Sequence, residues 1–262
     1  MDGRATASTP RPVDLGDHET VVVDSGGSGV PLLLVHGVSF DWRMWTLVVA
    51  ALPAAIRTIA YDLRGHGAAR GAPGAPTPAV LAADLADLLD ALELPSARVA
   101  GLSYGGTVAE QFALTYPQRL AGLALVSTRA SPFPPFADLA ATAERVGLES
   151  QVEPALARWF GPDVVAEGGW PVTYARECLR TIPLPTWTTA FRAIAVFDVL
   201  DRLEHVAAPT RVIAAELDSV ATPEHMRAIA ARLPGGEFHV VAHGRHLLAL
   251  QRPSELASLL TP

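Results

Sequence analysis

Short apolar runs alternate with longer segments of helical spacing along most of this chain. Runs of this kind, bounded by turn residues, are typical of buried strands. The expected strands are 21–23, 31–35, 57–61, 99–102, 120–126, 210–215 and 237–241, and the expected helices are 42–52, 79–92, 107–116, 223–233 and 247–260. Buried strands that alternate with helices predict an α/β fold with a parallel sheet covered on both faces. The glycine-rich stretch 24–29 is expected to form a hairpin turn between the first two strands.

The alternation stops at Ser127. From there to about Val199 the pattern is helical, prolines interrupt it repeatedly, and it carries three of the five tryptophans, Trp159, Trp170 and Trp187. We therefore expect an inserted helical lid over 129–199, an α/β core made of 13–128 and 200–262, and a flexible N-terminus over 1–12. Some lid aromatics are expected to line a pocket at the junction with the core, where ligand sites favour apolar walls.

Composition narrows the possible environments and partners. The formal net charge is −7 without a basic cluster, so nucleic acid and anionic membrane surfaces are poor partners. No apolar run approaches the roughly 20 residues that span a bilayer, and the N-terminus lacks a signal-peptide core. The single cysteine, Cys178, cannot form an internal disulfide and is interpreted as a buried small residue. We expect a cytoplasmic protein, and its oligomeric state stays open.

The candidate chemistry centres on Gly101-Leu102-Ser103-Tyr104-Gly105, between a predicted strand and a predicted helix. In that context the pattern predicts a tight turn that holds Ser103 in a strained backbone conformation with its hydroxyl exposed. Gly101 and Gly105 allow the strand and the helix to pass closely. Ser103 is thus the candidate nucleophile.

A serine nucleophile needs a base, and the base needs an acid that orients it. Asp218 follows the strand 210–215 and His246 follows the last strand, so the chain order is Ser, Asp, His, as expected around such a turn. Glu216 is the alternative acid and His243 the alternative base. We favour Asp218 because Glu216 would need a different loop path.

An oxyanion also needs donors, and the backbone amides of Val38 and Tyr104 are the candidates. Val38 follows an early strand in the run His36-Gly37-Val38. We interpret His36 and His66 as supports of their loops. The histidines do not pair at ligand spacing with cysteine or carboxylate, so no metal site and no cofactor are expected.

Taken together, these motifs resemble those of lidded α/β-hydrolases over nearly the whole chain. The matching residues are His36-Gly37, 62–67, 101–106, Asp218, and His246 seven residues before Pro253. The stretch 197–203, with 209–213, is similar to 3-oxoadipate enol-lactonases, esterases and cofactor-free haloperoxidases. The resemblance implies an α/β-hydrolase fold with a mostly parallel central sheet, flanking helices and an inserted helical lid. Arg245 departs from the pattern, because a small residue usually precedes the histidine, and it is expected to point to solvent.

The resemblance implies a serine hydrolase that cleaves a small-molecule ester or lactone through an acyl-serine. Two alternatives keep the same three residues: a cofactor-free haloperoxidase or perhydrolase, in which peroxide replaces water, and a carbon-carbon bond hydrolase. A third is a non-catalytic binding protein with the same pocket. The acyl and leaving groups do not follow from the sequence.

Overall fold

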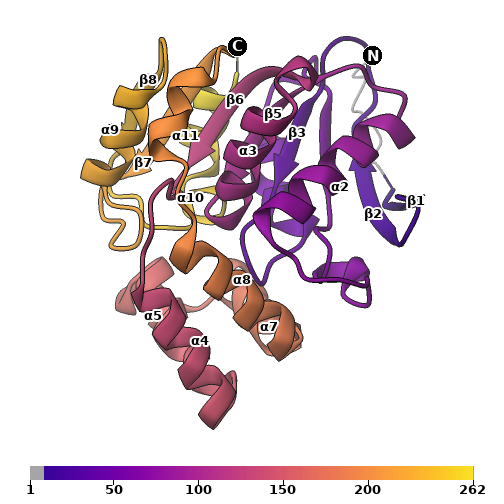
Figure 1. The fold of residues 1–262 in the computed structure, drawn as a ribbon. Helices are drawn as coiled ribbons and strands as arrows, with labels where there is room; N and C mark the ends of the chain where they lie inside the picture. The colour runs from indigo at the N-terminus through magenta and orange to yellow at the C-terminus, as the bar shows by residue number, and fades with distance from the viewer. Residues whose placement is uncertain (1–8, 262) are drawn as a thin grey trace, which may run out of the picture.

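A sheet of eight strands runs through the molecule in the computed structural model, which describes residues 9–261 (Figure 1). The strand order is β1-β2-β4-β3-β5-β6-β7-β8. The strands are β1 Arg11–Asp14, β2 Glu19–Asp24, β3 Leu32–Val35, β4 Thr58–Tyr61, β5 Ala97–Leu102, β6 Leu120–Val126, β7 Thr210–Ala215 and β8 Glu237–Val241. From β4 to β8 neighbouring strands are parallel, whereas β2 pairs antiparallel with both β1 and β4. The predicted mostly parallel α/β sheet is confirmed.

The expected hairpin after the first predicted strand is wrong. β2 pairs with β1 and β4, and the chain crosses over β4 to reach β3. All four residues of β3 are buried, so this strand needs a neighbour on each side and lies inside the sheet. The end of β2 is instead linked to the start of β4 by an ion pair, in which Arg57 Nη2 lies 2.7 Å from Asp24 Oδ2. β1 was not expected. It includes Arg11 and Pro12, so the predicted flexible segment 1–12 is wrong at its end, whereas residues 1–8 of that segment lie outside the described residues.

Apolar side chains of the strands alternate between two clusters, one on each face of the sheet. Leu33 and Val35 belong to one cluster and Leu32 and Leu34 to the other. The first cluster packs against helices α2 Pro78–Ala91, α3 Tyr104–Thr115 and α9 Pro223–Arg232. The second packs against α1 Thr46–Ala51, α10 Leu248–Gln251 and α11 Pro253–Leu260. The sheet is therefore covered on both faces, as predicted.

Five further helices lie between β6 and β7 in sequence and form a group at one end of the sheet (Figure 1). They are α4 Pro135–Val146, α5 Glu149–Phe160, α6 Pro162–Glu167, α7 Trp170–Thr181 and α8 Leu184–Val196. We call α4 to α8 the helical insertion. The prolines of this segment mostly stand at the first positions of its helices, where a missing amide proton costs nothing.

Two expected helices are each divided in two. The segment 42–52 begins with a 3₁₀ turn, Trp42–Trp45, before α1, and Arg252 separates α10 from α11. Arg252 precedes Pro253, whose ring disfavours helical backbone at the preceding residue. Within residues 9–261, no helix has the length and apolar character needed to cross a bilayer.

Glu110 on α3 is fully buried, and neither of its carboxylate oxygens has a hydrogen-bond partner within residues 9–261. Burial raises the pKa of this carboxyl well above its ordinary value. The unfolded chain therefore loses the proton at lower pH than the folded chain does. The stability that neutral Glu110 contributes is fully present below its pKa in the unfolded chain, about 4.3. Above that pH the free energy of unfolding falls by about 1.4 kcal/mol per pH unit, until the pKa of Glu110 in the folded chain is reached.

We expect Glu110→Gln to stabilise the protein relative to wild type at pH 8 by more than at pH 5. Glutamine has nearly the same shape and carries no charge at either pH, so it removes only the cost of ionisation. Denaturant unfolding of both proteins at the two pH values measures the difference. An equal difference in unfolding free energy at pH 5 and pH 8 would mean that Glu110 is not held neutral by burial.

Candidate active site

Ser103 stands at the sharp turn between β5 and α3, with φ 56° and ψ −117°. A positive φ is costly for a residue with a side chain, and such strain is concentrated at functional sites. The two flanking glycines make the turn possible. A Cβ at Gly101 would collide with the backbone of Gly105, and one at Gly105 would collide with the carbonyls of Val35 and His36. The strained serine turn predicted from the sequence is therefore present.

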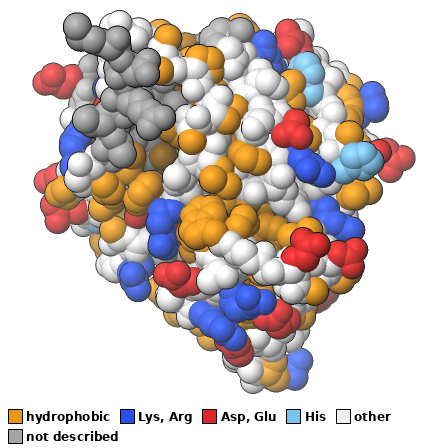
Figure 2. All heavy atoms as spheres, turned by 180° about the vertical axis from the view of Figure 1, so that it is seen from behind, with side chains coloured by type: hydrophobic (Ala, Val, Ile, Leu, Met, Phe, Trp, Pro, Cys, Tyr) orange, Lys and Arg blue, Asp and Glu red, His pale blue; other side chains and the backbone are white. Residues whose placement is uncertain are grey.

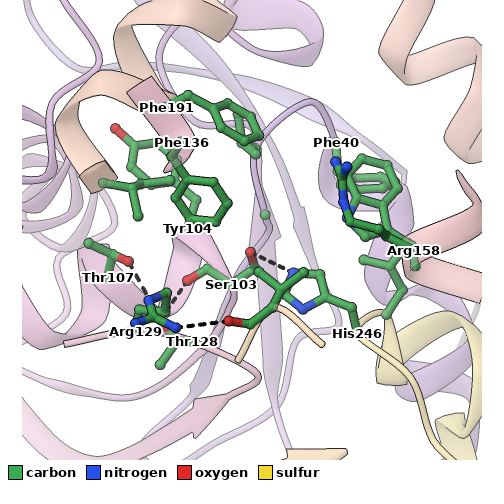
Figure 3. A pocket seen from close by; sticks show the side chains of 16 residues that line it. Phe40, Ser103, Tyr104, Thr107, Thr128, Arg129, Phe136, Arg158, Phe191 and His246 are labelled. Carbon is green, nitrogen blue, oxygen red and sulfur yellow. Dashed lines mark hydrogen bonds between the residues drawn. The ribbon is translucent and has the colours of Figure 1, made fainter. Parts of the chain in front are cut away.

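Three residues predicted to act together meet at this turn, although they lie far apart in sequence. Figure 3 shows two of them, Ser103 and His246. The Ser103 Oγ lies 2.9 Å from Nε2 of His246, and Nδ1 of the same ring lies 2.8 Å from Oδ2 of Asp218. Each residue follows the carboxyl end of a strand: β5, β7 and β8. Because these strands are parallel, the three side chains gather at one edge of the sheet.

The surroundings of Asp218 keep its carboxylate ionised. Burial alone would raise the pKa of Asp218, but the adjacent His246 and two backbone amides outweigh burial and lower it. The amides of Val220 and Ala221 donate to Oδ1 at 2.7 and 3.1 Å. Oδ2 is thereby left for the histidine ring, which fixes the orientation of the imidazole and favours a proton on Nδ1.

The alternative acid and base pair with each other, away from Ser103. The backbone amide of His243 donates to Glu216 Oε2 at 2.7 Å, and the His243 side chain is exposed. Arg245 was expected to point to solvent. It is half-buried and lies over Gly161, at the junction of α5 and α6, where it lines a cleft separate from the Ser103 pocket.

The two predicted oxyanion donors flank the serine. Tyr104 is the first residue of α3, so its amide has no intrahelical acceptor. The loop that holds Val38 packs against the serine, since a Cβ on Gly37 would lie 3.5 Å from Ser103 Cβ. His36 supports this loop: Nδ1 donates to the Gly37 carbonyl at 2.8 Å, and Nε2 accepts the Leu63 amide at 3.0 Å. Burial lowers the pKa of His36 to about 4, so the ring stays neutral.

A pocket with mostly apolar walls opens above Ser103 (Figure 3). Its cavity volume is about 30 Å³, which holds one or two water molecules. The core contributes Gly37, Val38, Phe40, Ser103, Tyr104, Thr107, Thr128, Arg129, Val220, His246 and Leu247, and the helical insertion contributes Phe136, Arg158, Trp159, Phe191 and Ile194. Larger substrates therefore require side chains or insertion helices to move.

Thr128, just after β6, is a supporting residue that the sequence did not single out. Its hydroxyl donates to the Ser103 carbonyl at 2.7 Å and lies 3.5 Å from the Thr107 hydroxyl (Figure 3). A Cβ on Gly106 would collide with the Thr128 side chain. The only sequence signal was its position after a buried strand.

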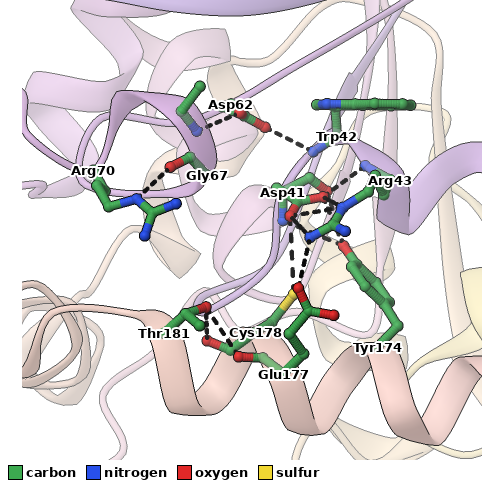
Figure 4. A network of polar contacts seen from close by, with 11 residues as sticks. Asp41, Trp42, Arg43, Asp62, Gly67, Arg70, Tyr174, Glu177, Cys178 and Thr181 are labelled. Atoms are coloured by element: carbon green, nitrogen blue, oxygen red, sulfur yellow. Dashed lines mark hydrogen bonds and ion pairs between the residues drawn. The ribbon is translucent and has the colours of Figure 1, made fainter.

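A polar network ties the loop after β3 to helix α7 of the insertion (Figure 4). Asp41 forms a 2.8 Å ion pair with Arg43 and accepts a hydrogen bond from the Tyr174 hydroxyl at 3.0 Å. The Cys178 thiol faces the same carboxylate at 3.9 Å. Burial, followed by the charge of Asp41, raises the pKa of Cys178 to about 12, so the thiol is protonated. The interpretation of Cys178 as a buried residue is confirmed.

Residues 9–261 contain no group of three or more histidine, cysteine or acidic side chains that could hold a metal ion. On the face shown in Figure 2, acidic and basic side chains are interspersed.

Comparison with known proteins agrees with this geometry. The model of the Alpha/beta hydrolase family matches residues 32–259. The chain is 25% identical to 3-oxoadipate enol-lactonase 1 of Acinetobacter baylyi, over 92% of this chain and 91% of that protein. Among solved structures, a thermophilic esterase from Thermogutta terrifontis, with malate bound, has a TM-score of 0.86 at 30% identity, covering 97% of each chain. A hydrolase from Pseudomonas aeruginosa PA01 has a TM-score of 0.88 at 29% identity, covering 97% of this chain and 98% of that one. The chain belongs to the Alpha/beta hydrolase family and is an enzyme of that family.

Proposed function

We propose that this enzyme is a serine hydrolase that cleaves a small-molecule ester or lactone through an acyl-serine intermediate. The observation that carries the proposal is the chain of two short contacts, Ser103 to His246 and His246 to Asp218, at the floor of a pocket with apolar walls. The enol-lactonase and esterase relatives support the same reaction class.

In the first half of the reaction, the Ser103 oxygen attacks the ester carbonyl carbon while His246 Nε2 takes the hydroxyl proton. Asp218 holds the imidazole and stabilises its positive charge. The amides of Val38 and Tyr104 receive the oxyanion, and each such donor is worth roughly 3 kcal/mol in the transition state. His246 then gives the proton to the leaving alkoxide, and the acyl group stays on Ser103.

In the second half, water attacks the acyl-serine while His246 takes a proton from it. The acid leaves, and Ser103 regains its proton from His246. The helical insertion acts as the lid in this account, since five of its residues line the pocket above Ser103.

Hydrolysis of matched esters tests the proposal. We expect release of p-nitrophenolate from p-nitrophenyl acetate with saturation kinetics. The kcat/KM is expected to be at least tenfold lower for the octanoate ester, because its longer acyl chain must displace more of the side chains that line the pocket. Addition of hydrogen peroxide distinguishes hydrolysis from peracid formation. A folded protein that releases no acid from either ester or from a small lactone, or that forms peracid faster than acid, contradicts the proposed reaction.

A further inference from the structure

The pocket above Ser103 contains positive charge and no negative charge. Two arginines, Arg129 and Arg158, are among its lining residues, and no aspartate or glutamate is. This contrasts with the whole chain, in which acidic residues outnumber basic ones by 27 to 20. The excess of cations in the pocket is therefore local.

Arg129 has partners in the protein. Its Nη1 donates to the Val220 carbonyl at 2.9 Å, and its guanidinium lies 4.4 Å from the centre of the Phe133 ring. Because Val220 follows Asp218 closely, these contacts hold the loop that carries the acid. The presence of the Arg129 cation in the pocket is thus accounted for by its contacts within the protein.

Arg158 on α5 differs from the neighbouring arginines of the helical insertion. Arg176, Arg180 and Arg192 each pair with a glutamate on the surface, at 2.9, 2.6 and 2.5 Å. Arg158 is half-buried and makes no hydrogen bond or ion pair within residues 9–261, and burial lowers its pKa without an opposing contact. A cation that is partly removed from water without a partner is destabilising, so an anion arriving there would be bound strongly.

The direction of the side chain places this charge within the site. Figure 3 shows the Arg158 guanidinium directed into the pocket beside Phe40, on the His246 side of Ser103, whereas Phe136 and Phe191 lie on the opposite side. In the proposed reaction His246 delivers its proton to the leaving oxygen, so the leaving group lies on the His246 side. The acyl part of the substrate then lies on the opposite side, against Phe136 and Phe191.

We propose that Arg158 is a specificity-determining residue that binds a carboxylate on the leaving-group part of the substrate. This inference rests on the proposed function, because the serine mechanism decides on which side of Ser103 the leaving group lies. The substrate class is accordingly an ester whose alcohol part is a hydroxy acid, or a lactone that carries a free carboxylate on the alcohol side of its ring oxygen, with a small apolar acyl part. A guanidinium suits this role because its planar donors match the two carboxylate oxygens.

Three small esters test the proposal. O-acetylglycolate carries the carboxylate on its leaving group, 2-methoxyethyl acetate is a neutral counterpart, and monomethyl succinate carries the carboxylate on its acyl group. We expect the ratio of kcat/KM for O-acetylglycolate over the neutral ester to fall about 10- to 100-fold in Arg158→Met, mainly through KM, as expected for loss of one charged hydrogen-bonded contact. Comparing variants on the same substrates cancels differences in intrinsic ester reactivity. Arg158→Lys is expected to keep part of the preference.

Arg192→Met is the matched control, because it removes an insertion arginine that faces solvent and pairs with Glu144. It is expected to leave the ratio unchanged. An unchanged ratio in Arg158→Met overturns the proposal, and so does a wild-type preference for monomethyl succinate over O-acetylglycolate. If wild type hydrolyses none of the esters, the proposed function fails. Calorimetric binding of O-acetylglycolate to Ser103→Ala with and without Arg158→Met then tests Arg158 alone: weakening by tenfold or more supports it, and equal affinity overturns it.

Discussion

Replacing Ser103 with alanine is expected to lower kcat for ester hydrolysis by on the order of 10⁶ while leaving the thermal unfolding midpoint nearly unchanged. The loss is large because Ser103 forms the covalent bond to the acyl group. The other hydroxyl of the turn, that of Tyr104, is engaged with the Pro76 carbonyl. The Oγ makes only one described hydrogen bond, to His246 Nε2, so its removal costs little packing. Alanine at φ 56° keeps the same backbone strain.

The matched control is Ser28→Ala, which removes an exposed hydroxyl in the loop before β3. Its kcat is expected to equal that of wild type. Initial rates on p-nitrophenyl acetate, together with thermal unfolding, measure both variants. Residual activity of Ser103→Ala within a hundredfold of wild type would assign the nucleophile to another residue.

Asp218→Asn is expected to lower kcat by about 10⁴, because an amide in place of the carboxylate favours the wrong tautomer of His246 and does not stabilise its charge. The substitution is nearly isosteric, and the amides of Val220 and Ala221 can still donate to the remaining oxygen. The fold is therefore expected to stay intact. The effect falls on kcat, since the acid does not line the substrate pocket.

Glu216→Gln is the comparison that separates the two candidate acids. Glu216 accepts the His243 amide and is exposed, so this variant is expected to retain kcat within about threefold. Steady-state kinetics on one ester measure both variants. A reversed order, with Glu216→Gln the more damaged enzyme, would show that the 2.8 Å contact between Asp218 and His246 is not the one used in catalysis.

The parallel part of the fold could be predicted because its strands are short apolar runs bounded by turn residues, a pattern that indicates buried strands. β6, β7 and β8 have the predicted bounds, and so does the serine turn with its two glycines. β1 could not be predicted, because Arg11–Asp14 contains one buried residue and therefore shows no apolar run. The false hairpin had a local cause: the glycines of 24–29 favour a turn, whereas the position of β3 depends on its burial between β4 and β5.

The residue types of the candidate site and their order along the chain could be predicted, whereas the contacts that surround these residues could not. Ser103, Asp218 and His246 follow strands, and a parallel sheet brings such positions together. The choice of Asp218 over Glu216 becomes evident only when the β7 loop is seen to turn Asp218 toward the ring and Glu216 toward His243. Which arginine of the helical insertion faces the pocket depends on how α5 packs, so the sequence could not single out Arg158.

The claim that Ser103 is an activated nucleophile is tested most directly by intact-mass analysis after treatment with a small fluorophosphonate. This reagent phosphonylates a serine only when a base and an oxyanion site activate it. The account predicts one adduct per chain on wild type, mapped to the peptide that contains Ser103, no adduct on Ser103→Ala, and much slower labelling of Asp218→Asn. An unlabelled wild type, or a Ser103→Ala protein that is labelled as fast as wild type, would contradict it.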